Sequence, residues 1–231
     1  EETPFLADGI TLDINNPTLP ISWSENAENY WILQNNEDLP LIFNGSAAVR
    51  SNQALSQVPV GNVMCYAQGR LSVALPDRIS FRVGDLVFGS SGTVANQYRD
   101  AMLYFTENNF LNEAGDLQAR VFGAPSNFGY ITAMFAAAQP DTQLGQGPLM
   151  VGQQYQVFTI QLPFDRTTWK NLTQPQQTTT PILGPLGQSS TIQVNTDIWY
   201  RAIDGIRSYI MAQRGINSGP GMTPMSSEIG N

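Results

Sequence analysis

Short runs of alternating apolar and polar residues constrain the fold of this chain more than any other feature. The stretch 100–135 contains three candidate strands: an apolar run over residues 101–105, an alternating run over 117–121, and a run of β-branched and aromatic residues over 130–135. Two loops rich in turn-forming residues join them. In the middle run, apolar side chains alternate with polar ones at a period of two, which predicts a strand with one buried face. We therefore expect this stretch to form the middle of an all-β domain.

The front half of the chain repeats this pattern. Residues 71–75 and 79–83 alternate on either side of a Pro76-Asp77 turn, and a further edge strand is expected over residues 10–14. Apolar runs recur roughly every eight to twelve residues, which is the spacing typical of sandwiches and barrels. The sequence predicts an all-β fold, an antiparallel β-sandwich or barrel with one C-terminal α-helix.

The periodicity changes after two long polar segments, residues 139–154 and 174–190, which we interpret as loops. The next residues offer N-cap side chains, and Gly215 can end a helix. Between them, apolar residues recur at helical spacing: Trp199, Ala202, Ile203, Ile206 and Ile210. We expect a helix through Arg214, and thus a β-rich domain over residues 1–190 followed by a helix and an extended tail over residues 191–231.

The composition excludes several classes of function. The chain has no histidine, so Ser-His and Cys-His nucleophile pairs are absent, as are nearly all catalytic zinc sites. Its single cysteine, Cys65, lies in an apolar stretch and is expected to be a small buried side chain rather than a nucleophile. We predict no catalytic residues, no cofactor and no metal.

The charge balance bears on the partners of the chain. The formal net charge is −8, with only 11 Lys and Arg among 231 residues, so direct contact with nucleic acid is not expected. No apolar run approaches the ~20 residues that a membrane span needs. Because the chain begins with Glu1 rather than Met, we expect it to be a trimmed fragment or a product of polyprotein cleavage.

Carboxylates are the remaining acid-base groups, and four of them lie close together in the sequence: Glu25, Glu28, Glu37 and Asp38. A solvated polar face is the simpler interpretation, and a glycosidase-like pair of acids is the alternative. Two aromatic residues in the same segment, Trp23 and Trp31, could stack on a sugar ring, although packing in the core is the expected role for both.

The order of elements in the middle of the chain resembles a known family. An apolar strand, a Gly-containing turn, an alternating strand that begins at Leu117, and Gly129-Tyr130-Ile131-Thr132 at the start of the next strand resemble the later part of the protruding domain of calicivirus capsid proteins. The likeness continues through the apolar strand 155–160. It then includes four single residues, Arg166, Trp169, Leu172 and Pro175, so that it covers residues 100–175 of 231.

The resemblance implies a domain that forms dimers on the capsid surface and carries receptor contacts, often to host glycans, on an outer subdomain. The 99 residues before Asp100 are short for a full outer subdomain, and the segment after Thr191 extends beyond the family pattern. No receptor-binding residue can therefore be transferred, and the ligand-binding residues stay unknown.

From these observations we expect a non-enzymatic structural capsid protein of a small RNA virus, located at the surface of the virion. It would be the protruding domain, self-associate with other capsid subunits as a homo-oligomer with dimer contacts, and bind a host-cell glycan or protein receptor. Two alternatives are a jelly-roll shell subunit of a picorna-like virus and a non-enzymatic carbohydrate-binding β-sandwich. A carboxylate-dependent hydrolase is the third.

Overall fold

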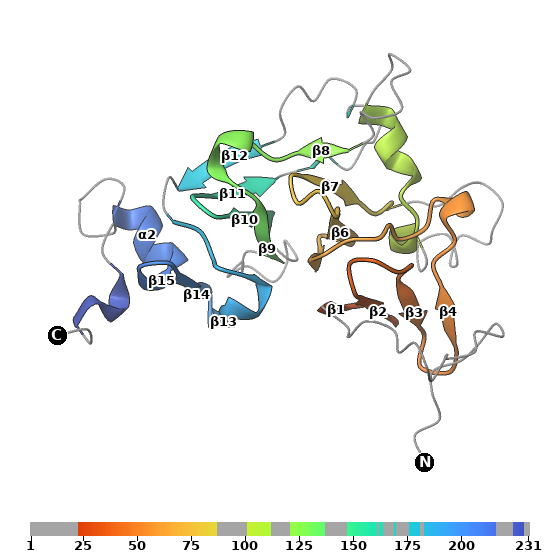
Figure 1. The fold of residues 1–231 in the computed structure, drawn as a ribbon, viewed down its shortest axis with the longest axis horizontal. Coiled ribbons are helices and arrows are strands. Elements are labelled where there is room, and N and C mark those ends of the chain that lie inside the picture. The colour runs from red at the N-terminus through yellow and green to blue at the C-terminus, as the bar shows by residue number, and fades with distance from the viewer. Residues whose placement is uncertain are drawn as a thin grey trace. The chain divides into compact units, whose positions relative to one another are not determined.

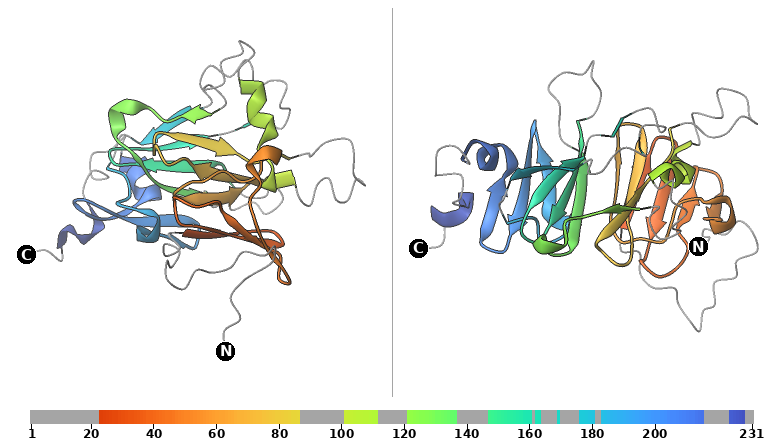
Figure 2. Two further views of the ribbon diagram at one scale, coloured as in Figure 1. Left: turned by 45° about the vertical axis from the view of Figure 1, so that its right-hand side comes forward. Right: turned by 90° about the horizontal axis from the view of Figure 1, so that it is seen from above.

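The chain consists of two units built from antiparallel sheets (Figures 1 and 2). The computed structural model describes residues 23–86, 101–111, 121–136, 147–160, 162–163, 169, 176–180, 183–215 and 224–228. The contacts within the chain separate unit 1, residues 1–122, from unit 2, residues 123–231. The predicted all-β, antiparallel sandwich with a C-terminal α-helix is confirmed, and no sheet closes into a barrel within the described ranges.

Unit 1 contains two four-stranded sheets. The first has the order β1-β2-β3-β4, formed by Trp23–Ala27, Tyr30–Gln34, Leu41–Phe43 and Ala48–Arg50. The second has the order β5-β6-β7-β8, formed by Met64–Ala67, Arg70–Ala74, Ser80–Val83 and Phe122–Gly123. In the described part of this unit they are accompanied by the 3-10 helices η1 (Gln53–Leu55), η2 (Ala101–Leu103) and η3 (Thr106–Leu111). The hairpin predicted over residues 71–83 is thereby confirmed as β6 and β7.

The core of unit 1 joins its two sheets. Alternation in β2 places Ile32 in this core and leaves Trp31 at the surface. The cluster draws on both sheets and on η2: Ala27, Ile32, Ile42, Val58, Met64, Leu71, Val73, Met102, Leu103 and Phe105. Burial of apolar side chains at this scale is the main term that stabilises such a unit.

Unit 2 has a four-stranded sheet and a three-stranded sheet. The order β12-β11-β10-β9 is formed by Gln176–Thr180, Val157–Ile160, Leu149–Gln153 and Ile131–Ala136. The order β13-β14-β15 is formed by Thr191–Val194, Asp197–Ala202 and Gly205–Ser208. Among the described residues, the unit also contains the helix α2 (Tyr209–Gly215) and the 3-10 helices η5 (Ser126–Phe128), η8 (Gln188–Ser190) and η10 (Met225–Glu228). Its core contains Ala133, Phe135, Met150, Val157, Ile198, Tyr200, Ala202 and Tyr209.

The three strands expected over residues 100–135 have different outcomes. The strand at 130–135 is confirmed as β9. The strand at 101–105 is wrong, because residues 101–103 form the buried helix η2 and Tyr104 makes only an isolated bridge to Gln57. An apolar run without alternation cannot distinguish a strand from another buried conformation. The strand at 117–121 lies almost entirely outside the described residues.

The predicted C-terminal helix is wrong over its first half. Residues 197–208 form the hairpin of β14 and β15, and the helix α2 begins only at Tyr209. In β14 the inward-facing Ile198 and Tyr200 are buried, but the outward-facing Trp199 is also apolar. Apolar residues on both faces of the strand produced the apparent helical spacing.

Both segments interpreted as polar loops contain strands. The first includes β10, a central strand in which every residue is buried, and the second includes edge strand β12. The domain boundary placed at residue 190 remains a prediction, and the contacts of the chain place a division after Phe122. The strand expected at 10–14 lies outside the described residues.

Candidate functional site

The β1–β2 hairpin carries most of the predicted site residues. Its strands are joined by the two-residue turn Glu28-Asn29, in which Glu28 has a φ of +53°. The register places Asn26 opposite Trp31 and Ala27 opposite Tyr30. Trp23 pairs with Gln34, so these two side chains point to the same face of the sheet. Neighbouring residues of a strand point to opposite faces, and Trp31 is three residues before Gln34, so Trp31 points to the other face.

The two tryptophans consequently have separate environments. Trp23 packs against the core of unit 1, as expected. Trp31 was expected in the core as well, but its side chain is 53% exposed. It shares the outer face with Leu33 and, through the register with β3, with Phe43 and Leu41, all three of them half-buried. The hairpin therefore offers one exposed aromatic ring rather than a pair that could enclose a sugar.

Glu25 lies on the inner face of the hairpin and contacts the second sheet of unit 1. Its Oε1 accepts a hydrogen bond of 2.9 Å from the backbone N–H of Tyr66 in β5. Burial raises the pKa of Glu25, although the Tyr66 amide and the Trp23 side chain oppose this shift. A raised pKa is a property that a general acid needs. Here the carboxyl group faces the backbone of β5, which it binds to β1.

Glu28 contacts the same tyrosine. The Tyr66 hydroxyl donates a hydrogen bond of 2.6 Å to Glu28 Oε1, and burial together with this carboxylate raises the pKa of Tyr66. Glu25 and Glu28 thus meet at one residue of the opposite sheet and hold the edge of β5 against the hairpin. These contacts give both carboxylates a structural role, which is to hold the two sheets of unit 1 together.

Glu37 and Asp38 are exposed in the loop between β2 and β3. Both backbone N–H groups donate to Asn35 Oδ1, and Asn35 Nδ2 donates to Asp38 Oδ2 over 2.6 Å. This is a local turn closed by an asparagine side chain, and it confirms the expected solvated polar face for these two residues. The same expectation is wrong for Glu25, which is partly buried in strand β1. The structure does not bring these two residues together with Glu25.

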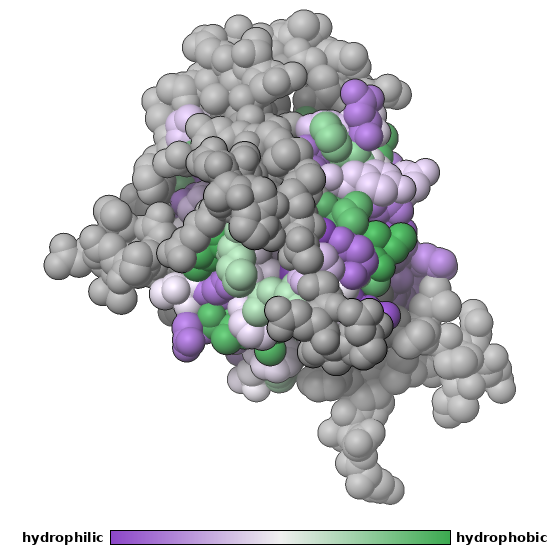
Figure 3. Space-filling view, turned by 90° about the vertical axis from the view of Figure 1, so that its left-hand side faces the viewer, coloured by the Kyte–Doolittle hydropathy of each residue, from purple (hydrophilic) through white to green (hydrophobic). Residues whose placement is uncertain are grey.

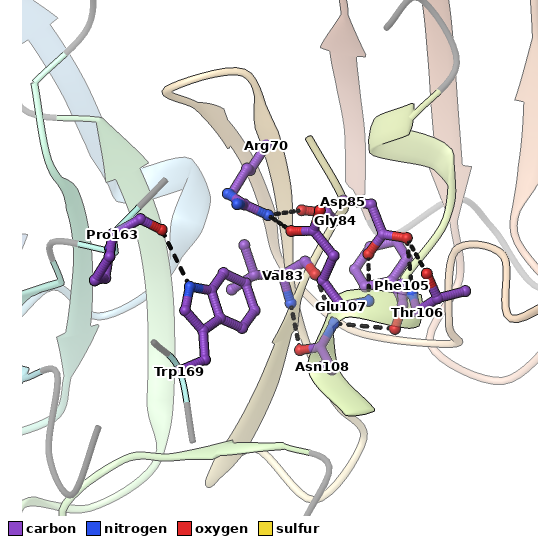
Figure 4. A network of polar contacts seen from close by, with 10 residues as sticks. All are labelled: Arg70, Val83, Gly84, Asp85, Phe105, Thr106, Glu107, Asn108, Pro163 and Trp169. Atoms are coloured by element: carbon purple, nitrogen blue, oxygen red, sulfur yellow. Dashed lines mark hydrogen bonds and ion pairs between the residues drawn. The ribbon is translucent and has the colours of Figure 1, made fainter. Parts of the chain in front are cut away.

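A buried polar cluster in unit 1 was missed by the sequence analysis (Figure 4). Arg70 in β6 pairs with Glu107 in η3 at 2.5 Å, and both side chains are almost fully buried. Arg70 also donates to the backbone C=O of Gly84 over 2.9 Å. The available signal was an arginine at the start of a strand that is mainly apolar, but its partner lies 37 residues away in sequence.

Asp85 forms the second half of this cluster. Its carboxylate accepts hydrogen bonds from the backbone N–H groups of Thr106 and Glu107 and from the Thr106 hydroxyl, at 2.5–3.0 Å. It therefore fixes the first turn of η3, where backbone N–H groups lack partners. Burial raises the pKa of Asp85, while the hydrogen bond from the Thr106 hydroxyl is the largest opposing effect.

Asn108 completes the attachment of η3 to the second sheet. Its Oδ1 accepts from the N–H of Val83 at 3.2 Å, and its Nδ2 donates to the C=O of the same residue at 2.6 Å.

Elsewhere in Figure 4, within unit 2, the buried Trp169 donates through its indole N–H to the C=O of Pro163. The three other single residues of the calicivirus resemblance, Arg166, Leu172 and Pro175, lie outside the described residues.

Cys65 is buried, which confirms the interpretation as a small core side chain. Burial raises the pKa of its thiol, so the thiolate that acts as nucleophile or metal ligand is disfavoured at neutral pH. In the described part of the chain, no three His, Cys, Asp or Glu residues lie close enough to hold a metal ion. Among the same residues, no helix has the length and apolar character that crossing a bilayer requires.

Comparison with known proteins gives no relative for this chain. No protein-family model, no curated protein and no solved structure matches it. The resemblance to calicivirus protruding domains therefore rests only on the sequence motifs named above, and it remains a prediction.

Proposed function

We propose that this chain is a structural capsid protein of a small RNA virus, the surface-exposed protruding domain, which self-associates and contacts the host cell without catalysing a reaction. The two all-β units and the low content of charged residues, 13%, support this proposal. So does the way in which the buried polar side chains of unit 1 bind backbone groups of the fold.

The observation that carries the proposal is the outer face of the β1–β4 sheet. Trp31 is half exposed there, with Leu33, Leu41 and Phe43 on the same face. Large aromatic side chains at the surface of a sheet are typical of contact sites, because their burial by a partner provides much of the binding free energy. The acidic residues of this region lie in turns or between the sheets, and the charged side chain that the register places on this face is Arg50, opposite Leu41.

Sedimentation of the protein from its native source tests the virion hypothesis. We expect it to travel with nuclease-protected RNA in particles of fixed size. A small soluble species free of RNA would contradict the proposal.

Cell attachment tests the role of the outer face. Particles that carry Trp31→Ala should bind host cells at least about tenfold more weakly, as for an interface hot spot. Leu55→Ala is a matched control, because Leu55 is 54% exposed in η1 of the same unit. Equal attachment by both variants would remove Trp31 from the receptor contact.

A carbohydrate-binding β-sandwich is the second candidate, and one observation favours it. The exposed ring of Trp31 lies directly across from Asn26 on the same face, so an apolar platform stands beside an amide that can bind hydroxyl groups. Binding of a glycan panel by a monomeric chain that does not sediment with RNA, abolished by Trp31→Ala, would select this function.

A further inference from the structure

Strand β13 is an open edge of the β13-β14-β15 sheet in unit 2. It pairs with β14 on one side, and its Ile192 is 64% exposed. The pair Val194–Asp197 closes the two-residue turn, so the N–H and C=O groups of Gln193 point away from β14. Among the described residues, no group hydrogen-bonds to these two groups of Gln193.

At two other positions in the described ranges, outward backbone groups are bound by a side chain of the same chain. Gln188 binds both backbone groups of Met134 in the edge strand β9, and Asn108 binds both backbone groups of Val83 in β7, whose outer neighbour β8 has only two residues. On the far side of the β13-β14-β15 sheet, the N–H of Ile206 donates to the Ser226 hydroxyl at 3.0 Å. Proteins usually block exposed edges, because an open edge pairs with strands of other molecules.

The sequence of β13, Thr-Ile-Gln-Val, contains none of the residues that normally discourage such pairing, namely charges, proline or glycine. This matters for a chain with a net charge of −8, because two copies repel each other wherever carboxylates meet. On the face shown in Figure 3, hydrophobic residues reach the surface among hydrophilic ones. In unit 2, five residues expose large apolar side chains between 186 and 211: Leu186, Ile192, Ile203, Ile206 and Met211.

A second copy fits this edge by symmetry. In an antiparallel pairing with Gln193 opposite Gln193 of the second copy, each residue donates its free N–H to the free C=O of the other. The same register sets Ile192 opposite Val194 of the second copy on one face of the sheet. Such a contact is isologous and closes after two copies, so it forms a dimer rather than a fibre.

We propose that two copies of this chain associate through β13, antiparallel and centred on Gln193, so that their three-stranded sheets become one continuous sheet. This inference rests on the self-association contained in the proposed function and identifies the surface that mediates it.

Two substitutions at β13 test the proposal by sedimentation velocity over a concentration series. Gln193→Pro removes the outward N–H and leaves the hydrogen bonds to β14, which edge strands tolerate. Ile192→Lys places a charge against the same edge. We expect a dimer for the unaltered chain and dissociation constants at least about tenfold higher for both variants. The control Ile79→Lys alters an isoleucine of unit 1 that is 42% exposed, and it should leave the dimer intact.

Crosslinking tests the register without disturbing the contact. Opposed Cα atoms in a hydrogen-bonded antiparallel pair are ~5.5 Å apart, within reach of a disulfide. Gln193→Cys should therefore form an intermolecular disulfide on mild oxidation, whereas Thr196→Cys, three residues from the centre of the pairing, should not.

The outcomes separate this inference from the proposed function. Dimers that persist in both β13 variants, together with no Gln193→Cys crosslink, would overturn the β13 contact and leave self-association standing. A chain that is monomeric at every concentration would overturn the β13 contact as well. If that chain also failed to sediment with RNA, the proposed function would fall with it.

Discussion

The side-chain amide of Gln188 hydrogen-bonds to both backbone groups of Met134. Gln188 Oε1 accepts from the N–H and Gln188 Nε2 donates to the C=O, each at 2.6 Å. Met134 lies in β9, the last strand of its sheet, and is fully buried. The glutamine supplies the two hydrogen bonds that a neighbouring strand would supply, and it thereby joins η8 to the β9 edge.

Gln188→Ala should destabilise the protein by about 2–4 kcal/mol, because it leaves a buried N–H and a buried C=O without partners. Urea unfolding followed by circular dichroism measures this change. Gln154→Ala is the control, since Gln154 is exposed in the β10–β11 turn and should shift the midpoint little. Equal midpoints for the two variants would show that water replaces the amide at Met134.

The buried pair of Arg70 and Glu107 provides a second test. Glu107→Gln should lower the free energy of unfolding by about 3 kcal/mol, because it leaves the guanidinium buried without its counter-charge. The double variant Arg70→Met/Glu107→Leu should recover part of this loss, since no charge then remains buried. A double variant less stable than the single one would contradict this account.

The contributions of two aspartates to the stability of the fold should depend on pH in opposite directions. Burial raises the pKa of Asp85 in the folded state, so its contribution to stability is present below the ordinary value of 3.8 and is lost as pH rises through the raised pKa. The Arg207 side chain lowers the pKa of Asp204, so that contribution is present above 3.8 and is lost as pH falls.

The free energy of unfolding of the variants Asp85→Asn and Asp204→Asn, measured between pH 3 and pH 7, tests the direction of both pH dependences. The stability difference between the unaltered chain and Asp85→Asn should grow as pH falls, and the difference for Asp204→Asn should shrink. If the two stability differences changed with pH in the same direction, burial of Asp85 would not raise its pKa in the folded state.

Asp197 holds the start of α2 against β14. Its carboxylate accepts from the N–H of Ile210, the Ser208 hydroxyl and the indole N–H of Trp199, at 2.5–3.0 Å. Asp197→Ala should cost about 2 kcal/mol, as for the loss of a helix cap with several donors. Asp197→Asn keeps one acceptor oxygen, so its midpoint of chemical denaturation should lie between those of the unaltered chain and Asp197→Ala. A midpoint for Asp197→Ala equal to that of the unaltered chain would contradict the cap.

The sequence predicted those elements whose alternation was clean. Residues 71–83 form the expected hairpin, in which apolar residues alternate along each strand and the Pro76-Asp77 turn lies between them, although the register sets Val73 opposite Arg82 and Ala74 opposite Phe81, so that both faces carry apolar side chains. Strand β9 follows its breaker residues as expected. Strand β10 escaped prediction because its Gln153 reads as polar, yet this residue is fully buried with its amide bound to Pro125 and Gly129. A buried amide is compatible with a core strand once its partners are in place.

The candidate site was less predictable, for two physical reasons. Trp23 and Trp31 were grouped because they are close in sequence, but the register of the hairpin places their side chains on opposite faces of the sheet. The Arg70–Glu107 pair joins residues that only the folded chain brings together. Alternation fixes the direction of a side chain within its strand, whereas pairing between distant segments depends on the tertiary fold.

The amide contacts of Gln188, Asn108 and Gln34 have a consequence for the conditions that the fold can withstand. Gln34 accepts from the N–H of Gly61 and donates to the C=O of Pro59, so it connects β2 to the segment that leads into β5. None of these groups titrates in water, and dissolved ions do not screen a contact between uncharged partners as they screen an exposed ion pair. The attachments that these three residues make should therefore persist from dilute buffer to brine and through mild acid.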